Sequence, residues 1–387
     1  MIKNKKLLLL SAVTLAVIIA ASVVVNLRAP KTVIEKGLLF PVLAGQINAI
    51  NKIQIKGHEE TVTLLKKAGQ WIVEESDGYP ALFDKVRRTV ISISELKVAA
   101  TRTSSPAMYP RLGVEGPEVA GSASVLITLE NNEGKEVAAL IVGKQRHSKS
   151  ADKNPGLYVR RPGDKPSLLV EGTLDITARM SDWFENTILD IPSSTIREIA
   201  TRHADGNSVR ITRDDRAQED FRLEDIPQGQ KVVTRIILNR MGTLLENMNV
   251  SRARAAGNFT FPEDRQVTTV RDFNGMGVTI TSTEIDNIAY TRFHFDYDPD
   301  MAIAESAADV AGDGSAQDGA TAEPVDFAAQ VSRLNATLSD WVYTIPEFKY
   351  EILAKRMEDL VKPGSPDDPV NVNEEIKLFT PEIPSDQ

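Results

Sequence analysis

The chain has 387 residues, more than one hydrophobic core usually organises, so we expect at least two folded units. Its 42% hydrophobic and 26% charged residues are typical of a globular protein and exclude disorder of the whole chain. A formal net charge of -9 disfavours nucleic acid as a partner, and the absence of cysteine excludes disulfides, thiolate nucleophiles and cysteine-bound metals.

Residues 1–28 predict a membrane anchor. Lysines within the first six residues precede an uncharged apolar stretch, Leu7–Leu27, and about 20 apolar residues cross the roughly 30 Å hydrocarbon core of a bilayer. Since lysines favour the cytoplasmic side, we expect a single-pass bacterial inner-membrane protein with a cytoplasmic N-terminus and a periplasmic bulk. The alternative is a cleaved signal peptide, although Val23–Val25 extend the apolar run beyond the small residues that could be cleaved.

After a linker over residues 29–41, alternating apolar residues predict the strands of a first module, residues 42–190. Pro80 suits the first turn of a helix whose apolar stripe runs to Ile93. A second helix is expected over Leu174–Phe184. The predicted strands lie around Ile53, Val62, Trp71, Val125, Leu140, Leu157 and Leu168, with a hairpin turn at Asn131–Gly134.

The same order of segments returns in residues 191–361, which predicts a second module of similar plan. Ile50–Ile53 corresponds to Ile196–Ile199, Gln70–Val73 to Asp220–Leu223, the helix after Pro80 to Val232–Leu245, and Met180–Trp183 to Leu338–Trp341. The fold class is therefore predicted to be α+β, with two tandem modules of mainly antiparallel sheet and packed helices after the anchor. The alternative is that any two strand–strand–helix stretches resemble each other to this degree.

Two segments of the second half have the composition of irregular structure. Residues 299–325 are rich in Ala, Gly, Asp and Ser and predict a flexible acidic insert. Residues 362–387 hold five prolines, many acids and little hydrophobic content, so we expect a disordered tail.

No set of residues in the sequence predicts catalysis or a cofactor. His58, His147, His203 and His294 are scattered singly, without the spacing of a zinc site. Gly312, Gly314 and Gly319 have the spacing of a dinucleotide fingerprint, but they fall in the acidic insert rather than between a strand and a helix.

Asp296, Asp298 and Asp300 form the best metal-like pattern, because calcium loops use alternating carboxylates. No glycine follows at the turn position, and Glu305 comes too early to close such a loop, so a solvated acidic loop is the competing interpretation. Asn274–Gly275 is typical of a hairpin turn. The three tryptophans, Trp71, Trp183 and Trp341, recur at matching places of the two modules and are expected in the core.

The order of several short motifs resembles the family known as domain of unknown function 4340. The motifs are Ile47–Ile55 ahead of Gln70–Val73, Gly78–Ala81 at the start of a helix, Tyr109–Val114, and Leu140–Lys144 followed by Leu157–Arg160. The resemblance is clearest over Val42–Ile191 and supplies no catalytic residues. It implies an association with ABC-type transport systems related to gliding-motility auxiliary proteins.

The sequence thus favours a membrane-anchored periplasmic accessory or scaffold subunit of an ABC-type transport or envelope machine that acts by protein contacts. The expected partners are the inner membrane and integral-membrane or ABC-type transporter subunits. A periplasmic module that binds a glycan or another ligand is the first alternative. A hydrolase that uses carboxylates alone is the second, because any two of the 54 acidic residues could meet in the fold.

Overall fold

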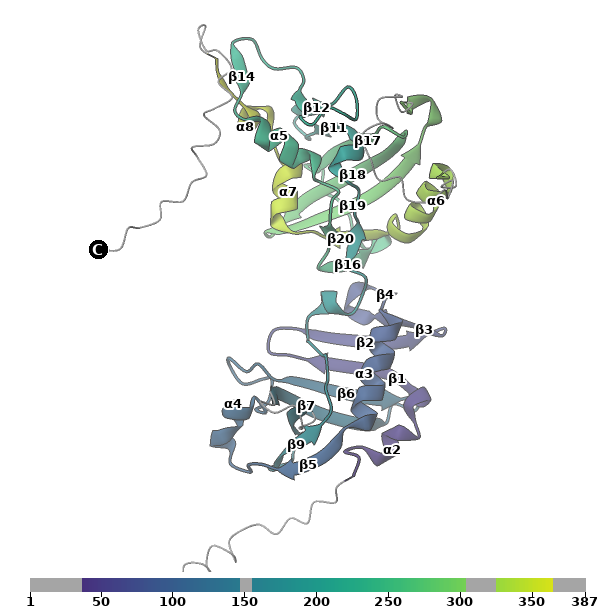
Figure 1. Ribbon diagram of the computed structural model, residues 1–387, viewed down its shortest axis with the longest axis vertical. Coiled ribbons are helices and arrows are strands. Elements are labelled where there is room, and N and C mark those ends of the chain that lie inside the picture. Colours follow the sequence, from purple (N-terminus) through teal and green to yellow (C-terminus); the bar gives the residue numbers. More distant parts are fainter. Residues whose placement is uncertain (1–36, 147–154, 304–324, 365–387) are drawn as a thin grey trace, which may run out of the picture. The chain divides into compact units, whose positions relative to one another are not determined.

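The computed structural model describes residues 37–146, 155–303 and 325–364 (Figure 1). Antiparallel strands dominate its regular structure and short helices accompany them, so the predicted α+β class is confirmed. Contacts divide the chain into two compact units, Met1–Glu59 with Arg87–Ile176, and Glu60–Val86 with Thr177–Gln387. Within the described ranges no helix is long and apolar enough to cross a membrane.

Some predicted segments lie outside the described residues. They are the anchor over residues 1–28, most of the acidic insert over residues 299–325, and the tail beyond Gly364. These expectations remain predictions.

Six strands of the first unit follow one another in the order β1-β6-β7-β8-β9-β5 (Figure 1). They are β1 (Ile50–Lys56), β5 (Lys97–Thr101), β6 (Val125–Asn131), β7 (Glu136–Arg146), β8 (Gly156–Arg160) and β9 (Ser167–Glu171). Side chains alternate across a strand, and Ile53 and Ile55 of β1 accordingly fill the core with 0% exposure. The short helices α2 (Pro41–Ala44) and α4 (Tyr109–Leu112) belong to the same unit.

Helix α3 (Phe83–Glu95) confirms the helix predicted after Pro80. Val86, Val90 and Ile93 are buried, which matches the apolar stripe read from the sequence. The helix ends two residues before Lys97, the residue that opens β5.

The second unit contains an eight-stranded sheet in the order β13-β12-β11-β17-β18-β19-β20-β16 (Figure 1). Its strands are β11 (Ile196–Arg202), β12 (Ser208–Thr212), β13 (Arg222–Leu223), β16 (Arg252–Ala255), β17 (Gln266–Asp272), β18 (Met276–Ile285), β19 (Ile288–Tyr297) and β20 (Trp341–Thr344). One face carries the core, with Phe293, Phe295 and Tyr343 at 1% exposure or less.

Shorter strands and four helices complete the second unit. Strands β2 (Thr61–Lys67), β3 (Gln70–Val73) and β4 (Tyr79–Pro80) pair in the order β4-β3-β2. Two further strand pairs join β10 (Thr187–Leu189) to β15 (Met248–Asn249) and β14 (Gln230–Val232) to β21 (Val361–Pro363). The helices are α5 (Arg235–Gly242), α6 (Phe327–Leu338), α7 (Glu347–Leu353) and α8 (Met357–Leu360).

Both predicted hairpin turns are confirmed, and both are closed by an acceptor side chain at the end of the preceding strand. Asn131 Oδ1 accepts from the amides of Glu133 and Lys135, both at 3.0 Å. Asp272 Oδ1 accepts from the amides of Asn274 at 2.9 Å and Met276 at 2.7 Å. Asn and Asp hold their own turn in this way because the short side chain reaches the amides two and four residues on.

The helix expected over Leu174–Phe184 is wrong, because only Met180–Asp182 forms one turn of 3-10 helix. Thr177 and Trp183 explain the difference. The Thr177 hydroxyl bonds the carboxylate of Asp182, and the Trp183 indole donates to the Thr177 carbonyl at 3.0 Å. These local side-chain bonds compete with the backbone hydrogen bonds of a regular helix, because the Thr177 carbonyl accepts from the Trp183 indole.

The helix expected over Val232–Leu245 is shorter than predicted. Val232 belongs to β14, where it pairs with Val361. Thr234 then caps the helix, since its side chain accepts from the Ile236 amide at 3.2 Å, so α5 begins at Arg235.

Candidate functional site

Strand β13 forms one end of the eight-stranded sheet, and among the described residues no strand pairs with its outer side. It pairs with β12 on one side only, with Leu223 opposite Ile211. The Glu224 amide donates to the Arg210 carbonyl at 2.8 Å. Because bonded and non-bonded residues alternate in an antiparallel ladder, the amide and carbonyl of Leu223 face away from β12.

Strand β3 shows how a comparable edge is covered elsewhere in the same unit. The Ala81 amide donates to the Trp71 carbonyl at 2.8 Å, and the Gly78 amide donates to the Val73 carbonyl at 3.1 Å. These bonds place β4 against β3 and leave the Tyr79 side chain only 6% exposed.

The segment that follows β13 does not pair with β13. Strand β14 pairs with β21 instead, with Val232 opposite Val361. In the described part of the chain, no turn or loop amide donates to the carbonyls of Phe221 and Leu223. An exposed strand edge of this kind is a template for a further strand.

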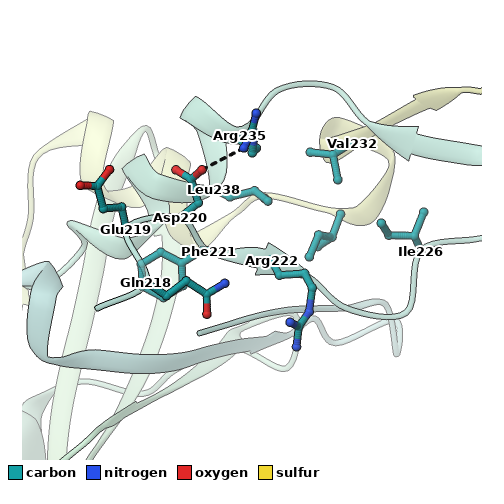
Figure 2. Close-up of a pocket in the computed structure, with 10 residues that line it drawn as sticks. Gln218, Glu219, Asp220, Phe221, Arg222, Ile226, Val232, Arg235 and Leu238 are labelled. Atoms are coloured by element: carbon teal, nitrogen blue, oxygen red, sulfur yellow. Dashed lines mark hydrogen bonds and ion pairs between the residues drawn. The ribbon is translucent and has the colours of Figure 1, made fainter. Parts of the chain in front are cut away.

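A pocket of about 590 Å³ lies beside this edge, and we call it the β13 pocket. Its floor is apolar, since Phe221, Leu223 and Leu238 are at most 3% exposed. Figure 2 shows Val232 and Leu238 lining the pocket while the Arg222 guanidinium points away from them. The lining residues are Gln218, Glu219, Asp220, Phe221, Arg222, Leu223, Ile226, Val232, Arg235 and Leu238.

The two arginines that line the β13 pocket form ion pairs. Arg235 meets Asp220 at 3.1 Å (Figure 2), and Asp220 also accepts from the Asn239 amide group at 2.7 Å. Arg222 bonds Asp214 at 2.9 Å and Glu224 at 3.1 Å. These pairs leave the apolar floor as the main recognition feature of the pocket.

The same ion pairs lower the pKa of the carboxyl groups around Arg222. The hydrogen bond from Arg222 lowers the pKa of Asp214. A hydrogen bond from the Thr212 hydroxyl is the largest cause that lowers the pKa of Glu224, and Arg222 lowers it further. Both groups are therefore ionised at neutral pH and offer no general acid.

Arg213 packs against the Phe221 ring. Its guanidinium lies 4.3 Å from the centre of the ring. It donates from Nε to the Ile196 carbonyl and from Nη1 to the Gln218 carbonyl, both at 3.1 Å. Arg213 is only 4% exposed, and burial lowers its pKa. A cation held by several carbonyls and an aromatic face makes a rigid support for the pocket floor.

The three aspartates considered for calcium have separate roles in the structure. Asp296 forms an ion pair with Arg271 on β17, and Asp298 caps the turn Pro299–Met301 by accepting from the Asp300 amide at 3.1 Å. Asp300 lines a different pocket, of about 410 Å³. No group of three possible metal ligands occurs among the residues that the structure describes.

The histidines of the described ranges have separate surroundings. His58 Nδ1 is 3.1 Å from the Pro117 carbonyl oxygen, and His203 Nε2 is 3.1 Å from that of Lys355. His294 is exposed on β19, opposite Thr279. His147 lies outside the described residues, as do the insert glycines Gly312, Gly314 and Gly319.

The tryptophans contribute to packing, although Trp183 and Trp341 do not occupy equivalent places. Trp71 on β3 is 8% exposed and Trp183 is fully buried. Trp183 follows a 3-10 turn, whereas Trp341 is the first residue of β20. Trp341 is half-buried, and its ring packs edge-on against Tyr79 with centroids 4.8 Å apart.

The β13 pocket was not found by sequence reasoning. The correspondence of Asp220–Leu223 to Gln70–Val73 indicated a strand, but the edge position depends on β14 pairing with a segment about 130 residues further along the chain. No local signal in the sequence reports such a long-range pairing.

Fold and site together define an antiparallel α+β protein with an apolar pocket at an uncovered sheet edge. Residues 71–269 match the family described as domain of unknown function (DUF4340), and the match spans half of the chain. The chain therefore belongs to the DUF4340 family, which confirms the resemblance noted in its motifs. Neither the curated proteins nor the solved structures contain a match to it.

Proposed function

We propose that the chain is a membrane-anchored periplasmic accessory or scaffold subunit of an ABC-type transport or envelope machine, and that it acts through protein contacts. The observation that carries the proposal is the uncovered edge of β13 beside an apolar pocket, because sheet edges and apolar patches are surfaces that proteins use to bind other proteins. The lysine-flanked apolar stretch Leu7–Leu27 supports the anchor.

The proposal includes a tandem arrangement of two similar modules. The run β1-β6-β7-β8-β9-β5 has the same order as β11-β17-β18-β19-β20-β16, and the pair β2-β3 corresponds to β12-β13. Both runs have an irregular register at the start of the first strand, between Ile50 and Lys52 and between Ile196 and Glu198. A shared bulge is a specific feature, because bulges are built into a strand at defined positions.

The hairpin turns support the same proposal. Asn131 and Asp272 end corresponding strands, and each accepts from the amides two and four residues on. An experimental structure tests the tandem arrangement by superposition of the two six-strand runs. A bulge that falls at different positions in the two first strands would contradict it.

Affinity capture tests the contact function. The bait is the full-length chain with a cytoplasmic N-terminal tag, solubilised in detergent, and the matched control joins residues 1–41 to an unrelated periplasmic protein. We expect integral-membrane or ABC-type transporter subunits to be enriched with the bait over the control in mass spectrometry. Recovery of the same proteins with both would show that the periplasmic part makes no such contact.

A ligand-binding module is the second candidate, and the β13 pocket is the observation that favours it. Its volume of about 590 Å³ lies within the range of about 300–1,000 Å³ that is typical of small-molecule sites. A ligand found by a thermal-shift screen should lose affinity in Val232→Trp, which fills the pocket. It should keep its affinity in Val233→Trp, because Val233 is 40% exposed and does not line the pocket.

A further inference from the structure

We propose that a basic surface of the first unit, on and around α4, binds the phosphate groups of anionic phospholipids at the membrane surface. This inference rests on the membrane anchor of the proposed function and adds a lipid contact to it. It leaves the edge of β13 free for the proposed protein contacts. We call this region the α4 surface, and its cations are Arg102, Arg111, Lys144, Arg160, Arg161 and Lys165.

Hydrogen bonds join the segments that carry these cations. Lys144 Nζ on β7 donates to the carbonyl of Pro110 in α4 at 3.2 Å. The Arg160 guanidinium lies 4.7 Å from the centre of the Tyr109 ring. The Tyr109 hydroxyl donates to the Lys165 carbonyl at 2.5 Å, which ties α4 to the turn between β8 and β9. The cations of β7, α4 and this turn therefore share one surface.

The positive charge of the α4 surface is not neutralised by ion pairs. None of its six cations pairs with a carboxylate within the described part of the chain, whereas Arg222 and Arg235 of the second unit both do. Acidic residues do occur in the same segments, namely Glu115, Glu118 and Asp164. The cations outnumber them, so this surface is positive in a chain whose formal net charge is -9. Such a cluster attracts anionic phosphate groups.

The first residues that the structure describes contact the α4 surface. Arg161 Nη2 donates to the Leu39 carbonyl at 2.6 Å, and its guanidinium lies 5.5 Å from the centre of the Phe40 ring. The anchor is predicted to end at Arg28, and the roughly nine residues from there to Gly37 span at most about 32 Å. A tether of this length keeps the α4 surface at a high effective concentration near the bilayer.

Exposed apolar side chains lie beside these cations. Met108 directly precedes α4 and is 38% exposed, and Val42 of α2 is 63% exposed. Figure 1 shows α2, α4 and β5 at the same end of the first unit. Cations with apolar neighbours suit a bilayer interface, because the cations meet the phosphates while the apolar groups enter the headgroup region. An acidic protein segment would match the cations alone.

Fluorescence quenching in nanodiscs tests the proposal on the full-length chain. The chain contains no cysteine, so Met108→Cys supplies a single site for a fluorophore beside α4. The quencher is a nitroxide attached to the lipid headgroup. Glu133→Cys, in the β6–β7 turn of the same unit, is the matched control. About eight residues of β7 separate Glu136, beside that turn, from Lys144 at α4, which is about 27 Å along a strand.

The composition of the discs gives the decisive comparison. We expect quenching at residue 108 to be about fivefold stronger in discs that contain phosphatidylglycerol than in discs of phosphatidylcholine alone, because basic residues near the surface bind anionic lipid. Added salt should weaken this difference. Quenching at residue 133 should be the same in both kinds of disc. Equal quenching at residue 108 in the two kinds of disc would overturn the proposal.

Two double variants of the Met108→Cys chain separate the charge of the α4 surface from the reach of the tether. Arg111→Glu with Lys165→Glu should abolish the additional quenching in phosphatidylglycerol discs. Arg88→Glu with Lys135→Glu makes the same charge change at exposed positions elsewhere in the first unit and should keep it. Additional quenching that survives in the first double variant, or disappears in both, would overturn the proposal.

Retention of the chain in the discs reports on the anchor separately. A chain that fails to enter the discs would overturn the anchor and this inference with it. A retained chain whose residue 108 makes no lipid contact would overturn this inference alone and leave the proposed protein contacts to the affinity capture.

Discussion

Lys349 of α7 binds the carbonyls that follow the end of α5. Its ammonium group donates to the carbonyls of Thr243 at 2.8 Å, Leu244 at 3.1 Å and Glu246 at 2.7 Å. The residue is only 5% exposed, and burial lowers its pKa from the ordinary value of 10.5, although Glu246 and Asp190 act in the opposite direction. A cation at the C-terminal end of a helix satisfies carbonyls that have no partner within the helix.

Replacing this cation should cost stability. We expect Lys349→Met to lower the free energy of unfolding by about 1–3 kcal/mol at pH 7, because buried carbonyls lose their donor. Between the lowered folded pKa and 10.5 the unfolded chain binds more protons, so wild-type stability rises with pH in that window. The difference from the variant should therefore grow toward pH 10. Urea unfolding at both pH values measures it, with the exposed Lys362→Met as a control that should change little.

Gly242 is required by the Phe221 ring at the floor of the β13 pocket. A Cβ at this position would lie 2.3 Å from a ring carbon of Phe221, whereas a Cβ at Gly257 would meet nothing within 4 Å. Gly242→Ala should therefore lower the free energy of unfolding by about 1–3 kcal/mol through overpacking. Gly257→Ala should be nearly neutral. Equal thermal stability of the two variants would show that the ring can move aside.

At the scale of elements, local sequence patterns identified helices and turns, whereas the pairing of distant strands was not predicted. The stripe through Val86, Val90 and Ile93 identified α3, and the turn residues Asn131–Gly134 identified the β6–β7 hairpin. These signals reside in the elements themselves. By contrast, the place of Val232 depends on Val361, which no window around α5 contains.

The candidate site was missed for the same reason. Phe221, Arg222 and Leu223 read as a strand, but whether that strand lies inside or at the end of a sheet depends on where β14 goes. The aspartates at 296, 298 and 300 were singled out by spacing alone. Spacing does not reveal that Arg271 from the neighbouring strand neutralises the first of them.

The β17–β18 hairpin makes a prediction at the element scale. Burial raises the pKa of Asp272, while hydrogen bonds from Met276 and Asn274 oppose the shift. The native state therefore holds this proton to higher pH than the unfolded chain, and stability falls as the pH rises from 3.8 through the raised pKa. Asp272→Asn keeps the acceptor oxygen without the charge, as Asn131 does in the first hairpin.

Thermal unfolding of two variants checks this reasoning. Asp272→Asn should be at least as stable as the wild type at pH 7 and should lose the contribution of this group to the pH dependence. Asp272→Ala should lose about 1–3 kcal/mol at every pH, because two turn amides lose their acceptor. If the alanine variant were as stable as the asparagine variant, the side chain would not hold the turn.

At the scale of the whole molecule, the two six-strand runs share one strand order, and two strand edges are covered differently. The edge of β3 is covered by β4, whereas the edge of β13 lies beside the β13 pocket. The tandem arrangement proposed above would allow such a difference, since a terminal strand contributes fewer ladder bonds than a central one.

The proposed membrane anchor leads to the last prediction, because a contact function at a membrane depends on tethering. Binding at a membrane partner benefits from an effective concentration of about a millimolar, which short linkers provide. A chain without Met1–Arg28, exported by a cleavable signal at native levels, should therefore fail to restore the phenotype of a deletion strain. The full-length chain with a reporter active only in the periplasm, fused after Gln387, should restore it and stay in the membrane fraction. Full complementation by the untethered chain would contradict a membrane-held subunit and favour the soluble ligand-binding alternative.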